Sequence, residues 1–376
     1  MAKIVYDYQV FCWQKYGGVS RYLYELATHL TQANEFEVKV LAIAYVNEYL
    51  KKCPPNLVVG FPVPHIPRGQ VTKILSKFNY EVSKAWLKVN PPDIIHQTYY
   101  STQAVTAKGA KVVVTVHDMT HERLQEFFNH KDIFNVKDNT SLAKKEAVER
   151  ADRVICVSEN TKKDLIEILA VDPQKISVIY HGYSANVARN LTPLDPRIPQ
   201  PYILYVGERG GYKNFQRFLQ AYASSKQLKN NFNIVCFGGG ALSASELNEI
   251  NALELPEGKI FQIAGDDELL ANLYRNASIF VYPSLYEGFG MPPLEAMALH
   301  CPVACSNTSC LPEVVGNAAA LFNPYEPENI AEVMEKVLFS TDKSNNLIQL
   351  GTERIKHFSW EICAEQTKRV YLDLLS

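Results

Sequence analysis

Residues 279–298, IFVYPSLYEGFGMPPLEAMA, decide the fold because they join a strand, a loop and a helix in one short stretch. The apolar run at the start predicts a buried strand that ends near Pro283. A glycine-containing loop follows at 287–291, and Pro292 and Pro293 suit the first turn of a helix, where a missing N–H is harmless. Such a strand–loop–helix segment is typical of the βαβ units that build parallel sheets.

The same alternation extends along the chain on both sides of this stretch. Apolar, β-branched runs such as KIVYDYQVF at 3–11, KVVVTVH, RVICVS, PYILYVG and NIVCFG alternate with amphipathic helical segments. The pattern weakens at 186–200, where prolines cluster, which predicts a linker. We therefore expect α/β domains at 1–185 and 201–358, with a last helix at about 359–376. Ligands of open parallel sheets bind at the carboxyl ends of strands, so the chemistry should lie in loops that follow strands.

Composition and charge narrow the class of protein. Hydrophobic residues make up 47% of the 376 residues and charged residues 21%, as in an ordinary globular protein of two domains. No apolar stretch approaches the ~20 residues of a membrane span, and no secretory pattern opens the chain, so we expect a cytoplasmic protein. The eight cysteines form no CxxC pair, which favours reduced, buried thiols over disulfides or a zinc site.

Two carboxylates in the opening stretch are candidates for ligand contact. Glu287 lies in the loop and Glu295 in the expected first helical turn, and the bend of the loop allows both to point into one site. The N–H groups of residues 288–291 would donate hydrogen bonds to hydroxyl or phosphate oxygens. The alternative is a solvated loop followed by an ordinary carboxylate near a helix start.

A second loop, in YILYVGERGGYKNFQRFLQAY at 202–222, carries Arg209 and Lys213 on a glycine-rich turn before a helix. Two cations at this position would stabilise a leaving diphosphate. A surface turn with solvated charges is the alternative. Gly238, the first of three glycines after NIVCF, would let a nucleotide approach the backbone, or would only serve a tight turn.

The first half offers two further candidates. His117 follows the apolar strand VVVTV and would lie at a ligand-binding edge, unless it is a structural histidine. Gly17 and Gly18 precede the first helix, where backbone N–H groups would accept an anion, unless the glycines serve only the turn. His117 and His121 lie four apart in an expected loop, which disfavours a metal pair. The chain contains no DxD, which argues against a metal-bound diphosphate.

The order of these motifs resembles retaining glycosyltransferases of family 4, closest to the mannosyltransferase-B-like branch of O-antigen and exopolysaccharide enzymes. The resemblance rests on YGGVSRYLYEL, VVVTVHDM, ADRVICVSENTKKDL, YILYVGERGGYKNF and PSLYEGFGMPPLEAMA, the last with the family's E-x7-E at Glu287 and Glu295. It implies a GT-B fold: two Rossmann-like domains facing across a cleft, with the last helix, around Trp360, crossing back to the N-terminal, acceptor-binding domain. One position departs from many relatives, because Glu208 takes the place of the arginine and Arg209 follows.

The resemblance also implies a role for each candidate residue. Arg209 and Lys213 would hold the donor diphosphate, Glu287 would lie by the transferred sugar and Glu295 would hold the ribose. The backbone N–H groups of Gly288, Phe289, Gly290 and Met291 would bind the sugar hydroxyls, and Gly17 and Gly18 would close over the phosphates. His117 would contact the sugar from the other domain, and Ser158 would line the cleft.

The expected function is transfer of a hexose from UDP-glucose, UDP-galactose or GDP-mannose to a glycan or lipid-linked acceptor, with retention of configuration and no metal or other cofactor. A GT-B-fold sugar-nucleotide epimerase and a non-catalytic nucleotide-sugar-binding subunit are the alternatives, and a periplasmic-type binding protein is a remote one. Residues 61–90 mix lysines with apolar residues, which suits either contact with an anionic membrane or an ordinary surface helix. No nucleic acid partner is expected.

Overall fold

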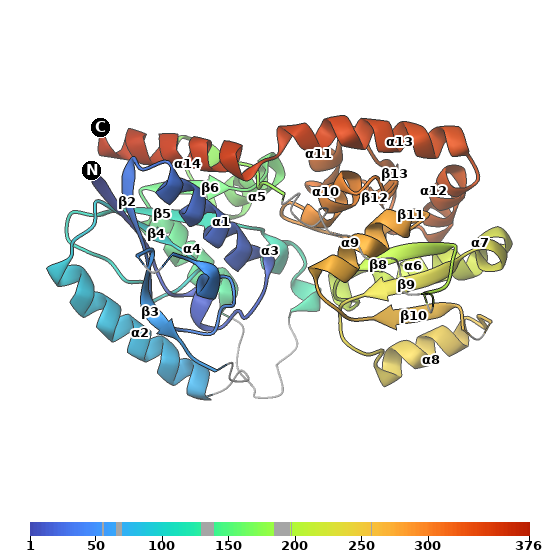
Figure 1. Ribbon diagram of the computed structural model, residues 1–376, viewed down its shortest axis with the longest axis horizontal. Coiled ribbons are helices and arrows are strands. Elements are labelled where there is room, and N and C mark those ends of the chain that lie inside the picture. Colours follow the sequence, from blue (N-terminus) through green and yellow to red (C-terminus); the bar gives the residue numbers. More distant parts are fainter. Residues whose placement is uncertain (55, 65–69, 129–138, 184–195, 197, 257) are drawn as a thin grey trace. The chain divides into compact units, whose positions relative to one another are not determined.

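A computed structural model describes the chain except residues 55, 65–69, 129–138, 184–195, 197 and 257, and the side chains of 70–72. The chain divides into two compact units, Met1–Gly182 with Trp360–Ser376, and Tyr183–Ser359. Each unit is a parallel sheet with helices packed around it (Figure 1), which confirms the predicted pair of Rossmann-like α/β domains. Most of the predicted linker at 186–200 lies outside the described residues.

The first unit has a seven-stranded sheet of order β3-β2-β1-β4-β5-β6-β7, in which all neighbours pair in parallel. Its strands are β1 Ala2–Tyr6, β2 Phe36–Tyr45, β3 Val58–Pro62, β4 Ile94–Gln97, β5 Lys111–Val116, β6 Arg153–Cys156 and β7 Ile176–Val178. The central strands are buried on both faces, which explains their continuous apolar runs.

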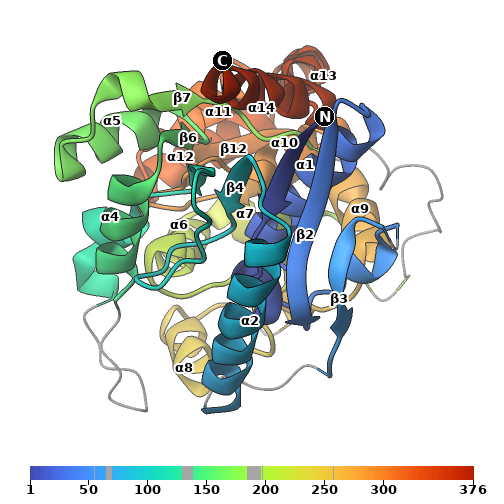
Figure 2. The ribbon, with the colours of Figure 1, turned by 90° about the vertical axis from the view of Figure 1, so that its left-hand side faces the viewer.

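The first unit also has helices between its strands and one helix at the end of the chain. They are α1 Gly18–Gln32, α2 Gln70–Val89, α3 Thr120–Arg123, α4 Thr140–Arg150, α5 Glu159–Leu169 and α14 Trp360–Leu375, with short 3-10 turns at Val10–Cys12, Leu50–Lys52, Gln125–Phe127 and Pro173–Lys175. Helix α2, which crosses the front of the view in Figure 2, packs on β2. The turn at Val10–Cys12 corrects the expectation of a longer first strand, and α3 places His121 on a helical turn instead of in a loop.

The last helix, α14, belongs to the first unit although it follows the whole second unit in sequence. It packs on α1 (Figure 1), and the hydroxyl of Tyr371 hydrogen-bonds Tyr6 on β1 at 2.8 Å and Nδ1 of His96 on β4 at 2.6 Å. Tyr371 is fully buried, so these contacts anchor the helix in the core of the first unit. The predicted return of the last helix to the N-terminal domain is confirmed.

The second unit has a six-stranded sheet of order β10-β9-β8-β11-β12-β13, again parallel throughout. Its strands are β8 Tyr202–Val206, β9 Asn233–Phe237, β10 Ile260–Ile263, β11 Ile279–Tyr282, β12 Val303–Ser306 and β13 Ala320–Phe322. Its helices are α6 Phe215–Ser224, α7 Lys226–Asn231, α8 Ala244–Ala252, α9 Asp267–Asn276, α10 Met291–Ala298, α11 Leu311–Val315, α12 Pro327–Leu338 and α13 Thr341–Arg354, with 3-10 turns at Gly211–Lys213 and Ile355–His357.

Each sheet has one point where the strand order reverses direction. In the first unit this point lies between β1 and β4, and in the second between β8 and β11. Loops after two such strands diverge to opposite faces of the sheet and leave a crevice at its carboxyl edge, where ligands of open α/β sheets bind. The candidate loops after β8 and β11 flank the second of these points.

Candidate functional site

In the second unit, Lys213 and Glu287 meet at the carboxyl edge of the sheet. Lys213 ends the 3-10 turn after β8, and its Nζ lies 2.7 Å from Oε1 of Glu287 in the loop after β11. The backbone supports this meeting, because the N–H of Leu285 donates to the carbonyl of Tyr212 at 2.8 Å. Two residues 74 positions apart are therefore held together at the reversal point of the strand order.

Aromatic rings complete the surroundings of this ion pair. The hydroxyl of Tyr282 donates to the same Oε1 of Glu287 at 2.7 Å, and the Lys213 ammonium lies 4.9 Å from the ring centre of Tyr212 and 5.8 Å from that of Tyr282. Burial, and then the Glu287 carboxylate, raise the pKa of Tyr282 well above its usual value, so it stays a hydrogen-bond donor. The side chains of Lys213 and Glu287 keep 21% and 13% of their surface exposed, so the cation is fixed in place yet open to a ligand.

Residues at the start of α11 pack against the loop 287–291 and hydrogen-bond to it. The thiol of Cys310 donates to the carbonyls of Glu287 and Phe289, and burial raises its pKa well above the usual value. Gly290 caps α10 with φ +91°, and a Cβ there would lie 2.8 Å from a methyl carbon of Leu311. Close packing and a left-handed backbone thus both require glycine at 290.

Glu295 lies one turn further along than expected. Helix α10 begins at Met291, so Glu295 starts the second turn of this helix. Burial, and then the charge of Glu295, raise the pKa of Tyr274 well above its usual value. Its expected contact with a ribose remains a prediction.

Arg209 takes a different place from Lys213, although both follow β8. Its side chain is only 3% exposed, with Nε 2.6 Å from Oε1 of Glu246 and the other nitrogens bonded to carbonyls of the loop 238–241. Gly238 begins that loop at the end of β9 with φ +85°. The expected contact of Arg209 with a diphosphate is untested, and its present contacts are all within the protein.

The candidates of the first unit lie at a separate sheet edge. His117 follows β5, is buried beside the rings of Tyr22 and His181, and its backbone N–H donates to the hydroxyl of Tyr100 at 3.0 Å. Burial lowers the pKa of His117 to about 4, so its imidazole is neutral near pH 7. A neutral imidazole can orient a hydroxyl but carries no charge for a phosphate.

The start of α1 is partly occupied by a neighbouring side chain. Gly17 caps the helix and Gly18 begins it, while the side chain of Gln14 accepts a hydrogen bond from the N–H of Ser20 at 2.9 Å. A Cβ at Gly17 would lie 2.3 Å from the end of the Gln14 side chain, which would then have to move away from Ser20. At the corresponding end of β6, Ser158 is buried and caps α5 through the N–H of Thr161 at 3.0 Å.

A pocket of about 470 Å³ lies at the reversal point between β1 and β4, and sequence reasoning missed it. Aromatic and polar side chains line it, namely Tyr8, Gln9, Cys12, Trp13, Lys73, Ser76, Tyr99, Tyr100, Ser101 and Thr140. Behind it the buried carboxylate of Asp7 accepts hydrogen bonds from Thr98 and Gln9. Two sequence signals pointed here, an aromatic-rich stretch after the first strand and QTYYS after the fourth.

The structure thus brings Lys213 and Glu287 together in one unit and places His117, Gly17 and Gly18 in the other. The cleft that would join the two groups stays a prediction. Within the described parts of the chain, no three His, Cys, Asp or Glu side chains are grouped to hold a metal ion.

Comparison with known proteins covers nearly the whole chain. The model "Glycosyltransferase Family 4" matches residues 16–187, and "Glycosyl transferases group 1" matches 193–354. The chain is 29% identical over 273 residues to O-antigen chain mannosyltransferase B of Escherichia coli, which is 69% of this chain and 70% of that protein.

Two further relatives have different coverage. The chain is 30% identical over 226 residues to the serotype-specific mannosyltransferase WbdA of Escherichia coli, but the match spans 56% of this chain and only 28% of WbdA. Among solved structures, sucrose-phosphate synthase from Thermosynechococcus elongatus has a TM-score of 0.77 and 21% identity, over 100% of this chain and 99% of that one. That likeness shows the fold. With the two family models and the two parallel sheets, the chain belongs to the GT-B glycosyltransferases that join a family 4 domain to a group 1 domain.

Proposed function

We propose that this protein is a retaining hexosyltransferase that transfers a sugar from a nucleotide-sugar donor to a saccharide of a surface polysaccharide. The contact between Lys213 and Glu287, at the reversal point of the second sheet, carries the proposal. A glycosyl donor presents a diphosphate and sugar hydroxyls to its enzyme. Lys213 offers a cation for the diphosphate, and the Glu287 carboxylate offers a hydrogen-bond acceptor for the sugar hydroxyls.

Donor binding would rearrange this pair. The diphosphate competes with Glu287 for the Lys213 ammonium, which stabilises negative charge on the leaving group as the glycosidic bond breaks. Glu287, still held by Tyr282, then accepts hydrogen bonds from sugar hydroxyls and orients the ring. The acceptor hydroxyl attacks the anomeric carbon on the face the diphosphate leaves, and its proton passes to a phosphate oxygen. Lys213 thus supplies the positive charge that a metal ion supplies elsewhere.

The names of the relatives bear on the transferred sugar. Both Escherichia coli relatives are mannosyltransferases, which favours a mannose donor over UDP-glucose or UDP-galactose for this chain. GDP-mannose is therefore the first donor to test.

We place the acceptor saccharide in the aromatic pocket of the first unit. Sugar rings bind aromatic faces through their C–H groups, and the rings of Trp13 and Tyr99, with centres 5.2 Å apart, line this pocket. Replacing Trp13 by alanine should raise the KM for an acceptor analogue such as p-nitrophenyl α-mannoside about tenfold and leave donor affinity unchanged. Equal loss of donor and acceptor affinity would remove the pocket from the acceptor site.

Helix α2 suits contact with an anionic membrane that carries a lipid-linked acceptor. Four exposed lysines recur with spacings of four, seven and four residues: Lys73, Lys77, Lys84 and Lys88. An exposed apolar residue directly follows each lysine in sequence, and these form a second row: Ile74, Phe78, Ala85 and Val89. Such adjacent rows favour binding at a lipid surface. No helix in the described parts of the chain is long and apolar enough to cross a bilayer.

Vesicle sedimentation tests this contact. Vesicles rich in phosphatidylglycerol should bind the protein, and pure phosphatidylcholine vesicles should not. The variant Ile74→Glu/Phe78→Glu should abolish binding. Undiminished binding by that variant would contradict the assignment.

Titration calorimetry tests the donor site. GDP-mannose, UDP-glucose and UDP-galactose are titrated into the protein in the presence of EDTA, and the donor that binds is then incubated with and without the acceptor analogue. Transfer only with acceptor, with the anomeric configuration kept by NMR, is expected. A new sugar nucleotide without acceptor would indicate an epimerase, and binding only after Mn²⁺ is added would refute the metal-free site.

A further inference from the structure

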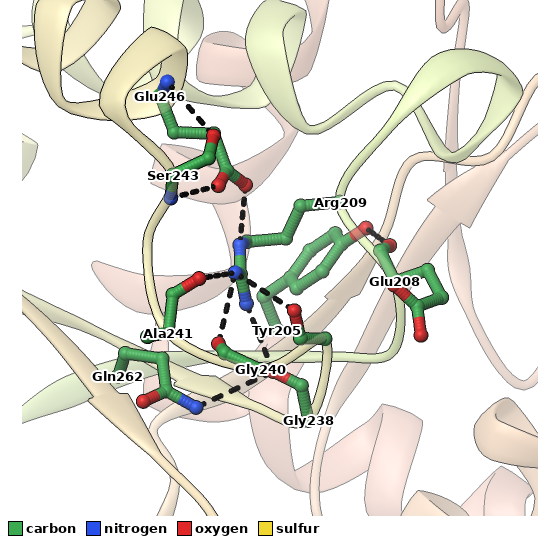
Figure 3. Close-up of polar contacts among 10 residues, drawn as sticks. Tyr205, Glu208, Arg209, Gly238, Gly240, Ala241, Ser243, Glu246 and Gln262 are labelled. Atoms are coloured by element: carbon green, nitrogen blue, oxygen red, sulfur yellow. Dashed lines mark hydrogen bonds and ion pairs between the residues drawn. The ribbon is translucent and has the colours of Figure 1, made fainter. Parts of the chain in front are cut away.

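The guanidinium of Arg209 lies at the centre of a ring of acceptors (Figure 3). Nη1 donates to the carbonyl of Gly238 at 2.8 Å, and Nη2 to those of Gly239, Gly240 and Ala241 at 3.0–3.1 Å. Nε pairs with Glu246 at 2.6 Å. All three nitrogens are therefore engaged inside the protein, in a fork geometry that a lysine cannot reproduce.

Glu246 is itself fixed by the start of α8. Its second oxygen accepts from the N–H of Ser243 at 2.7 Å, and its own N–H donates to the Ser243 hydroxyl at 3.2 Å, which together form a capping box. Burial acts to raise the pKa of Glu246, but Arg209 and Ser243 lower it overall, so the carboxylate is charged near pH 7. The helix thus holds Glu246, and Glu246 holds Arg209.

The backbone of the loop is shaped around Arg209. Gly238, Gly239 and Gly240 have φ values of +85°, +68° and +69°, which residues with side chains rarely adopt. A Cβ on Gly239 would lie 2.7 Å from Nη1 of Arg209 and 2.9 Å from the carbonyl of Gly207, whereas a Cβ on Gly240 would meet nothing within 4 Å. Gly239 therefore permits the close approach of the guanidinium.

The direction of the carbonyls sets the direction of the N–H groups. In a trans peptide the N–H points opposite to the preceding C=O, so the N–H groups of residues 239–242 point away from Arg209. None of these four donates a hydrogen bond to another residue that the structure describes. They follow β9, next to the loop that carries Lys213 after β8, because β9 and β8 are neighbours in the sheet. A row of N–H groups at this edge is a binding surface for phosphate oxygens.

We propose that Arg209 is a positioning residue: it gathers the carbonyls of residues 238–241 so that the N–H groups of residues 239–242 bind the phosphates of the donor. The inference rests on the proposed nucleotide-sugar donor. It differs from direct contact between Arg209 and the diphosphate, because here the guanidinium acts through the loop and the phosphates bind backbone.

The substitution Glu246→Gln separates the two possibilities. Direct contact predicts equal or tighter donor binding, because loss of the neighbouring negative charge frees the guanidinium. Positioning predicts weaker binding, about three- to tenfold in Kd, because Arg209 loses its anchor and the loop loosens. Arg209→Lys should weaken binding at least tenfold although the positive charge remains.

Two measurements test the proposal on the intact protein. Hydrogen exchange, without ligand, should be faster in both variants at the amide of Gly238, which starts the loop and donates to the carbonyl of Ile263 at 3.1 Å. Calorimetry with GDP-mannose and UDP-glucose should give the weaker binding stated above. Faster exchange with unchanged donor Kd would make the Arg209 cluster purely structural, and tighter binding by Glu246→Gln would assign Arg209 to the diphosphate; either result overturns the proposal. Failure of the wild type to bind any nucleotide sugar would instead refute the proposed function.

A pair of glycines provides a matched control. Gly239→Ala and Gly240→Ala introduce the same methyl group at nearly the same φ, but only the first displaces Arg209. Donor Kd should rise at least fivefold more for Gly239→Ala than for Gly240→Ala. Equal effects would attribute the loss to backbone strain and would contradict a role of the Arg209 contacts.

Discussion

Replacing Lys213 by alanine tests the centre of the proposed site. The ammonium lies 2.7 Å from Glu287 and keeps 21% of its side chain exposed, so the donor can reach it without unfolding the loop. In the proposed complex the ammonium makes a charge-assisted hydrogen bond to the diphosphate; this bond contributes about 1.5–3 kcal/mol and is lost in the variant. That range corresponds to about a 10- to 150-fold change in Kd.

Glu287 narrows this range because it competes for the same ammonium. Part of the energy gained with the diphosphate replaces a contact already present in the free protein, so we expect the lower end, about 10- to 30-fold weaker donor binding. The turnover number should fall as well, because the lost charge also stabilises the leaving group in the transition state.

Calorimetry with the donor, with EDTA present, measures the change in Kd. The matched control is Lys336→Ala, which removes a lysine paired with Glu332 at 55% exposure on α12, away from the sheet edge. The control should stay within twofold of the wild type. A Lys213→Ala protein that also binds within twofold, with an unchanged melting temperature, would refute the assignment of the diphosphate to this edge.

Three further substitutions probe single physical terms. Glu287→Gln should bind GDP or UDP at least as tightly as the wild type in calorimetry, because the anionic competitor for Lys213 is gone. The same variant should lower the turnover number about 100-fold. Parallel losses of nucleotide affinity and turnover would contradict separate roles for Lys213 and Glu287. His117 is neutral when folded with a pKa of about 4, so stability of the first unit should fall as pH drops from 6.5 to 4, by about 3 kcal/mol from this residue. His117→Gln should flatten that fall in urea denaturation followed by tryptophan fluorescence, since all tryptophans lie in the first unit; an unchanged slope would disprove it. Lys144→Met should lower the unfolding free energy in the same assay by about 3 kcal/mol, because it leaves the buried carboxylate of Glu122, 2.7 Å away, unpaired. The control Lys145→Met, at an exposed lysine, should change the unfolding free energy by less than about 0.5 kcal/mol. Similar effects of the two substitutions would refute the reasoning.

The strands of both sheets were predictable from the sequence. Parallel strands such as β5 and β11 are covered on both faces, so they appear as continuous apolar runs between turn residues. The sequence prediction of secondary structure was wrong where short 3-10 or helical turns interrupt the pattern. The first strand ends at Tyr6 and gives way to a 3-10 turn, and a single helical turn carries His121.

The chemistry of the loops was only partly predictable. Spacing and residue type made Lys213 and Glu287 candidates, and the fold brings their side chains to 2.7 Å from each other. The same reasoning paired Arg209 with Lys213 as diphosphate contacts. The structure buries the Arg209 side chain against Glu246, whereas Lys213 keeps 21% of its side chain exposed beside Glu287. The aromatic pocket was missed because its walls come from the loops after β1 and β4 and from α2.

The sequence by itself determined the order of strands and helices, the two-domain division and the loops that hold polar groups, because these depend on local periodicity. Tertiary structure alone decided which of those groups meet. Strand order makes β8 and β11 neighbours although 72 residues lie between the end of β8 and the start of β11. This pairing of the two strands creates the Lys213–Glu287 contact. It also decided that Arg209 is buried against Glu246, since only packing determines whether a cation faces protein carbonyls or solvent.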